Sequence, residues 1–280
     1  KKTRPSKTAV AMAHGNLSDL VFVALLIIVG QFFGCPHTLF QDVGPFKAQF
    51  KTESPDMTAL LKLSGGLVLI IGMMLSSVKW NPINGKMAGF GAFISLGYTI
   101  YSLFQADGVF VPRLLYAYIG VILVGALHIF AMPSNPLPPK TPETKNNHGN
   151  SSDLIALSLI AVSLLLFLYP QHLYQDLGPL KAQFKSETAD LSILTKFVAS
   201  LFLIIALMLS GVKWNKINGK LSGLGCFICA AYVAYSSYMA DGEKFVPHLF
   251  YVYSGILFFG GLHIFAFPSN KLPPKSAKKE

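Results

Sequence analysis

Charged residues are scarce in this chain of 280 amino acids: Asp, Glu, Lys and Arg make up 13% of it, against 52% hydrophobic residues. Soluble domains carry about a quarter charged residues, so the composition excludes an ordinary soluble protein. Cysteine is also rare, and three cysteines cannot form the framework of a disulfide-stabilised secreted domain. The sequence motifs of serine hydrolases, zinc proteases and P-loop proteins are absent too. The composition instead predicts an integral membrane protein.

The few charges separate long charge-free runs, each close to the roughly 20 residues with which a helix crosses a bilayer. The runs cover residues 20–41, 63–78, 87–106 and 114–139, and then 154–175, 197–212, 221–240 and 245–270. The two shortest runs are each preceded by two apolar residues and a lysine, Lys62 or Lys196. The long lysine stem can bring its ammonium to the interface, so both helices are predicted to start earlier. The sequence therefore predicts an all-α membrane protein with eight transmembrane helices.

The second four runs have the same lengths as the first four, which indicates an internal duplication. Residues 41–108 align with 175–242, with identity at about half of the positions or more. Because each copy has an even number of spans, we predict parallel tandem four-helix repeats related by rotation about the membrane normal. The predicted parts are a basic N-terminal arm (1–15), repeat 1 (16–133), a Pro-rich linker (134–149), repeat 2 (150–268) and a basic C-terminal tail (269–280).

Lysine and arginine are unevenly divided between the two predicted sides of the membrane. The side with both termini and the central linker carries 15 of them, and the other side carries six. The positive-inside rule places the richer side in the cytosol, stroma or matrix. Contact with anionic lipids then explains the net charge of +10 without nucleic acid as a partner. The first 18 residues contain no acid, as at the end of an organellar transit peptide, so a plastid thylakoid or mitochondrial inner membrane and an ordinary basic arm are both open.

Two histidines are the most deeply placed ionisable residues of the predicted spans. His128 and His263 lie near the basic-side ends of the fourth and eighth spans. A neutral imidazole can be the axial ligand of a haem, a chlorophyll or another pigment, or it can form a hydrogen bond with a neighbouring helix. No second histidine lies one turn away, which argues against paired haem ligation. Pigment ligation by one histidine and interhelical hydrogen bonding both stay open.

A Lys-Trp pair precedes an Asn-Gly sequence in each repeat, as Lys79-Trp80 and as Lys213-Trp214. Tryptophan favours the headgroup level and lysine the positive side, so these four residues are predicted to be interface anchors. Asn-Gly is predicted to form the tight turn of a helical hairpin. Glycines spaced four apart then begin the third span and predict close approach of another helix, namely Gly85, Gly89, Gly219 and Gly223.

A polar segment, residues 41–51, connects the first two spans and recurs as residues 175–185. Its phenylalanines fall on one helical face and its lysines on the adjacent face, which predicts a short amphipathic helix in the interface. A lid over a cavity and a docking surface are the alternatives.

Cys226 and Cys229 have the spacing of a redox or zinc motif, but the first repeat has alanine and serine there. The two cysteines are therefore predicted to be small packing residues, and no metal site is predicted.

The order of elements in each repeat resembles that of DoxX-like four-helix membrane proteins. The resemblance covers a first span, a polar excursion, a Gly-rich second span beginning Leu-Ser-Gly-Gly at residues 63–66, and two closely linked further spans. The tandem duplication departs from the usual single unit of that family. The resemblance implies a small helical bundle that associates with other membrane proteins, and it transfers no functional residue.

Three functions are compatible with these features. The first is a non-catalytic subunit of a larger organellar membrane complex, such as a photosystem accessory protein, with bound lipids or pigments and other membrane protein subunits as neighbours. The second is a channel or carrier for an ion or small solute, although no deeply buried charge marks a pathway. The third is a redox-associated membrane enzyme that uses His128 and His263. The first is the function that the sequence favours.

Overall fold

A computed structural model of the chain describes residues 16–43, 47–51, 53–105, 113–133, 135, 150–176, 181–184, 187–240 and 248–268. Within these residues, eight helices are long and apolar enough to cross a membrane. The predicted eight spans and the all-helical fold class are confirmed. The N-terminal arm, the C-terminal tail and all of the linker except Asn135 lie outside the described residues.

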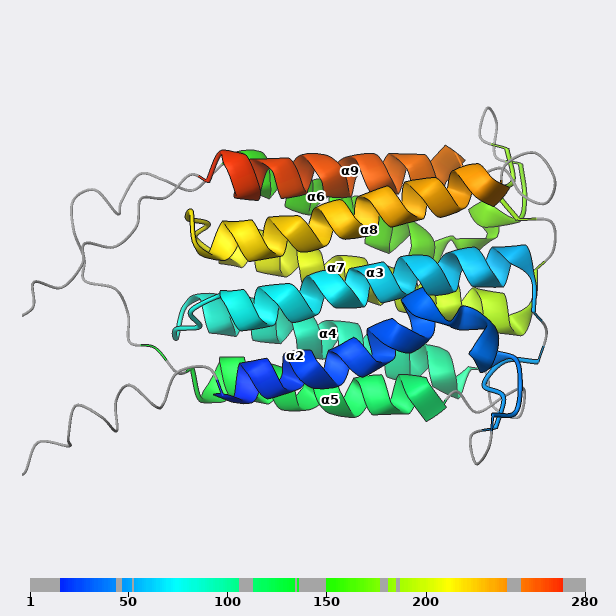
Figure 1. Ribbon diagram of the computed structural model, residues 1–280, viewed down its shortest axis with the longest axis horizontal. Coiled ribbons are helices and arrows are strands. Elements are labelled where there is room, and N and C mark those ends of the chain that lie inside the picture. Colours follow the sequence, from blue (N-terminus) through cyan, green and yellow to red (C-terminus); the bar gives the residue numbers. More distant parts are fainter. Residues whose placement is uncertain are drawn as a thin grey trace, which may run out of the picture.

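The eight helices run along a common long axis (Figure 1). The first half of the chain (residues 16–133) contains α2 (Asn16–Val29), α3 (Pro55–Ser77), α4 (Asn84–Phe104) and α5 (Arg113–Ala131). The second half (residues 150–268) contains α6 (Asn150–Leu168), α7 (Ala189–Gly211), α8 (Asn218–Ala240) and α9 (His248–Ala266). A π-helical turn, η1 (Gly30–Gly34), extends α2, and short 3-10 helices, η2 (Pro36–Leu39) and η4 (Pro170–Leu173), follow the first helix of each half.

Local capping explains where α3 and α7 begin. The hydroxyl of Ser54 accepts a hydrogen bond from the Met57 N–H, and Thr188 does the same for Leu191. Each cap satisfies one of the free amide groups at a helix N-terminus. Both helices therefore start before the charge-free runs, as the positions of Lys62 and Lys196 predict.

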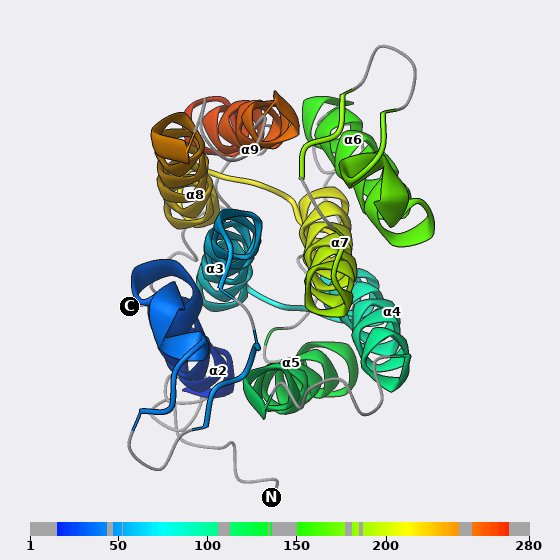
Figure 2. The same ribbon diagram turned by 90° about the vertical axis from the view of Figure 1, so that its right-hand side faces the viewer.

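The helices α3 and α7 lie side by side in the centre of the molecule, and the other six surround them (Figure 2). In the most apolar 18-residue stretch of each helix, 78% of the residues of α3 and of α7 are buried, against 28% to 50% in the outer helices. The two central helices therefore contact protein on nearly all sides, and the outer helices present one face to the surroundings.

Each central helix also packs against a helix of the other half. Helix α3 packs along α8, and α4 packs along α7. Small residues make this fit possible, because a Cβ at Gly91 of α4 would lie 2.5 Å from Leu207 Cδ1 of α7. On the other side, a Cβ at Gly225 of α8 would lie 2.7 Å from Met73 Sδ of α3. Each half therefore completes the other, an arrangement that the repeat pattern does not foretell.

The predicted interfacial amphipathic helix is not present in the described residues 41–43 and 47–51, and residues 44–46 lie outside the described chain. The side chain of Asp42 instead accepts hydrogen bonds from the Lys47 ammonium at 2.7 Å and from the Ala48 N–H at 2.8 Å. The bond from Lys47 lowers the pKa of the Asp42 carboxyl, with a further contribution from Ala48. Asp176 is bound in the same way in the second half. In both halves these bonds join the first described residues of the polar segment to its last ones.

Candidate binding pocket and the predicted site residues

Trp80 and Trp214, the predicted interface anchors, are both buried in the protein, with 2% and 1% of their surface exposed. The Trp80 N–H donates to the Leu75 carbonyl at 2.9 Å, and the Trp214 N–H donates to the Leu209 carbonyl at 3.0 Å. Both carbonyls belong to the last turn of a central helix, where no intrahelical donor is available. The tryptophans therefore cap α3 and α7 inside the protein.

The lysines of the same two motifs lie differently. Lys79 and Lys213 are exposed at the ends of α3 and α7. Their exposure is compatible with the predicted role as interface anchors, which stays a prediction.

The two predicted ligand histidines belong to helices on opposite sides of the molecule, α5 and α9 (Figure 2). They cannot hold one haem between them. His128 is buried. His263 is half-buried, and its Nε2 atom is buried without a hydrogen-bond partner among the described residues. Such an unpartnered nitrogen is unusual in a protein interior, so a pigment held by a single histidine would be expected at His263.

Replacing either histidine with glutamine is expected to leave the visible absorption spectrum of the protein from native membranes unchanged. Glutamine keeps a hydrogen-bonding side chain but removes the imidazole. Loss of an absorption band in His263→Gln, but not in His128→Gln, would contradict this expectation and establish pigment ligation by His263. Circular dichroism of both variants controls for folding.

Two buried carboxylates at one end of the central helices were not foreseen as a group. Asp56 and Asp190 lie in the first turns of α3 and α7, with 5% and 7% of their surface exposed. The Lys51 N–H donates to Asp190 Oδ2 at 3.3 Å, so a loop of the first half contacts a helix of the second. A carboxylate in the first turn is favoured by the helix dipole. Asp190 therefore links the two halves at this end.

The described residues contain no group of three or more His, Cys, Asp or Glu side chains that could hold a metal ion. Cys226 and Cys229 are buried free thiols. A Cβ at Gly66 would lie 2.4 Å from Cys229 Sγ, and a Cβ at Gly261 would lie 2.7 Å from Cys226 Cβ. The cysteines occupy places where the helices approach closely, which confirms their predicted packing role.

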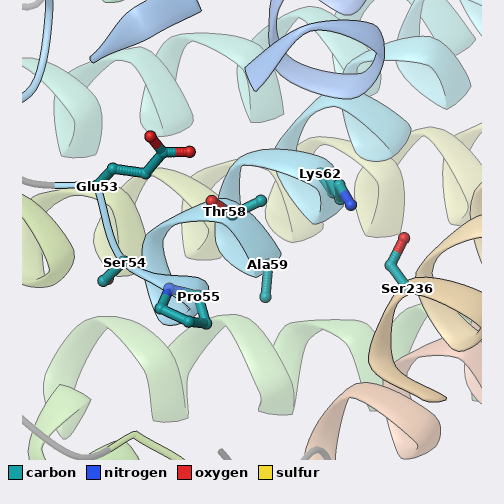
Figure 3. Close-up of a pocket in the computed structure, with 7 residues that line it drawn as sticks. All are labelled: Glu53, Ser54, Pro55, Thr58, Ala59, Lys62 and Ser236. Atoms are coloured by element: carbon teal, nitrogen blue, oxygen red, sulfur yellow. The ribbon is translucent and has the colours of Figure 1, made fainter. Parts of the chain in front are cut away.

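A cavity of about 440 Å³ opens between the first turns of α3 and the end of α8 (Figure 3). Its volume falls within the usual range of small-ligand sites. The residues that line it are Glu53, Ser54, Pro55, Thr58, Ala59, Lys62 and Ser236. It combines a cation, an anion and hydroxyl groups at the edge of an apolar bundle.

Lys62 provides the positive charge of this cavity. Its ammonium lies 5.7 Å from the centroid of the Tyr232 ring, within the range of a cation–π contact. The ion pairs among the described residues both lie elsewhere, in the 42–47 and 176–181 loops. In Figure 3 the ammonium and the Ser236 hydroxyl point toward each other, and the Glu53 carboxylate lies at the far end. The two charges of the cavity are therefore separated.

An aromatic contact beside the cavity fixes Tyr232. Its ring centroid lies 4.0 Å from that of Phe33, and its hydroxyl donates to the Phe33 carbonyl at 3.0 Å. Phe33 belongs to η1, the π-helical turn that extends α2. Glycine at position 65 permits its approach, since a Cβ there would lie 2.8 Å from Phe33 Cβ.

The lysine of the second half that corresponds to Lys62 has different surroundings. Lys196 donates to Gln105 Oε1 at 2.7 Å. A buried isoleucine, Ile193, takes the place of Ala59. Lys62 therefore faces an open cavity, whereas Lys196 is bound to an amide beside a larger side chain.

Comparison with known proteins gives no match to a family model, a curated protein or a solved structure. The DoxX-like resemblance thus depends on the order of the elements alone.

The sequence singled out Lys62 and Lys196 as lysines near the interface but did not foresee the cavity, because Ser236 comes from the other half. The Ser-Pro-Asp and Thr-Ala-Asp sequences at 54–56 and 188–190 are helix-start signals from which the buried acids could have been found.

Proposed function

We propose that this chain is a non-catalytic integral subunit of a larger membrane complex, in contact with lipids and with other membrane proteins. The packed seam between the halves carries this proposal. In carriers built from repeats, the substrate site lies at the interface between the repeats. Here the middle of that interface is filled by close contacts such as those of Gly91 with Leu207 and of Gly225 with Met73, and its cavity lies at one end, beside the first turns of α3. A seam packed in this way favours a rigid protein and argues against two halves that move relative to each other.

Hydrogen bonds across the seam add to its rigidity. Ser95 donates to the Ser200 carbonyl at 2.7 Å, and the hydroxyls of Thr99 and Ser200 share a bond of 3.0 Å. At one end of the seam, where α3 ends and α8 begins, the hydroxyls of Ser77 and Ser222 lie 2.8 Å apart. Polar contacts of this kind hold membrane helices together where water does not compete.

The outer surface supports the second part of the proposal, contact with lipids and neighbouring subunits. Each of the six outer helices exposes large apolar side chains, for example Ile27, Phe90, Tyr116, Leu157, Tyr238 and Phe259. Apolar surface of this extent is stable only against lipid or another protein. The organellar location and the identity of the complex belong to this proposal.

We further infer that the halves are tandem four-helix repeats related by an axis along the membrane normal. Recurring contacts support this, because the hydrogen bonds of Trp80 and Asp42 reappear at Trp214 and Asp176. Every pairing among the eight long helices also has its counterpart when the halves are exchanged, as α3 with α8 and α7 with α4. Both termini then lie on the basic stromal, matrix or cytosolic side.

The subunit role is tested by comparing the partner-free chain with the native assembly. We expect the purified chain in liposomes to pass ions and small solutes no faster than empty liposomes. We also expect native mass spectrometry of gently solubilised membranes to find the chain in a particle larger than itself. A flux well above that of empty liposomes would instead support the channel or carrier alternative.

A further inference from the structure

The cavity between α3 and α8 has one charge of each sign, at opposite ends. Lys62 and Glu53 supply these charges, and Figure 3 places them on either side of Thr58. A ligand with only negative charge would be attracted by Lys62 and repelled by Glu53. A net-neutral ligand with separated charges complements both ends.

Hydroxyl groups between and beside these charges are available for hydrogen bonds. The Thr58 and Ser236 hydroxyls make no hydrogen bond within the part of the chain that the structure describes, and both line the cavity. Serine and threonine hydroxyls can donate to phosphate oxygens, and an ammonium forms charge-assisted hydrogen bonds with them. The end of the cavity formed by Lys62 and Ser236 therefore fits a phosphate group.

The position of the cavity relates it to the bilayer surface. Lys62 lies in the second turn of α3, about 10 Å along the helix from its start. Around Ser236, helix α8 exposes Tyr235, Tyr238 and Met239. Tyrosine is favoured at the boundary between headgroups and hydrocarbon. A ligand whose polar head enters the cavity can thus lay an apolar tail against α8.

We propose that this cavity binds the head group of a zwitterionic phospholipid, with the phosphate at Lys62 and Ser236 and the ammonium at Glu53. The inference rests on the proposed function only in placing the chain in a bilayer. The second half provides an internal comparison. Lys196 already has a partner in Gln105, whereas the position equivalent to Gln105 is Met239, which has no carboxamide to offer Lys62.

The test measures lipid retention by the full-length chain. The purified protein is delipidated in detergent, offered equal amounts of phosphatidylethanolamine and phosphatidylglycerol with the same acyl chains, and examined by native mass spectrometry. We expect the wild-type chain to retain phosphatidylethanolamine in preference. Lys62→Gln should lower its retention at least about tenfold, since a charge-assisted hydrogen bond is lost. Lys196→Gln is the matched control and should behave as the wild type.

Three further variants test the two ends of the site and the volume of its cavity. Glu53→Gln should keep lipid bound but bring the ratio of the two lipids toward one, because it removes the partner of the ammonium. Ala59→Ile copies the side chain of the second half and should reduce retention of both lipids by filling the cavity. Ser236→Ala should weaken retention by a smaller factor than Lys62→Gln. Circular dichroism and thermal unfolding establish that each variant is folded.

Three outcomes would overturn the proposal. The first is equal retention of the two lipids by the wild-type chain. The second is an equal loss in Lys62→Gln and Lys196→Gln, which would indicate general attraction of lysine to headgroups. The third is displacement of the lipid by an equal concentration of water-soluble glycerophosphoethanolamine, which would assign the site to a free phosphate ester. None of these bears on solute flux or on complex size, so this inference and the subunit role can fail separately.

Discussion

The Gly219→Ala variant is expected to lose about 3 kcal/mol of unfolding free energy, because overpacking a tight helix contact is costly. A Cβ at Gly219 would lie 2.0 Å from the Ile264 carbonyl oxygen, and a Cβ at Gly85 would lie 2.1 Å from that of Ile129. These neighbours are backbone atoms, so no side-chain rotation can relieve the clash. The whole of α9, or of α5, must move away from its partner helix.

Gly255→Ala in α9 is the matched control. Nothing lies within 4 Å of a Cβ at Gly255. Alanine there is expected to be neutral or to stabilise the helix by up to about 1 kcal/mol, the cost of glycine in a helix interior. Unfolding in mixed micelles can be followed by the fluorescence of Trp80 and Trp214, the two buried tryptophans of the chain. Equal stability of Gly219→Ala and Gly255→Ala would contradict the close approach of α8 and α9.

Disulfides engineered across the seam are expected to join the two halves covalently. The pairs are Ser77→Cys with Ser222→Cys, and Thr99→Cys with Ser200→Cys, whose hydroxyl oxygens are 2.8 and 3.0 Å apart. Serine and threonine hydroxyls at such distances place the two side chains within reach of a disulfide. The native cysteines are first removed as Cys35→Ser, Cys226→Ala and Cys229→Ser, the last two copying Ala92 and Ser95 of the first half.

The readout requires a protease site inserted in the linker segment 136–149. After oxidation and cleavage, each cross-seam pair should keep the full mass on a non-reducing gel, and reduction should release two half-size bands. The control pair, Ser64→Cys with Thr99→Cys, places one cysteine on α3 and one on α4, both within the first half. Its thiols should remain titratable, because α7 lies between these helices (Figure 2). Oxidation of the control pair without that of the cross-seam pairs would indicate two separate bundles.

Much of the fold could be predicted because bilayer thickness and helix capping act locally. Each span needs about 20 apolar residues, so charge-free runs locate the helices. The early starts of α3 and α7 follow from lysines with long stems and from Ser54 and Thr188, which cap the first turns. The candidate site was harder to predict. Lys62 and Lys196 are identical in type and position along their helices, and their surroundings come from the opposite half of the chain.

The sequence alone determined the number of spans, the internal repetition and the close-packing role of the paired glycines and cysteines. Only the tertiary structure decided that α3 packs against α8, that Trp80 and Trp214 are buried, and that Asp42 accepts hydrogen bonds from Lys47 and Ala48. The physical reason is that lipid is as apolar as a protein core. Hydrophobic patterning therefore marks a membrane helix but does not tell which of its faces meets lipid and which meets another helix.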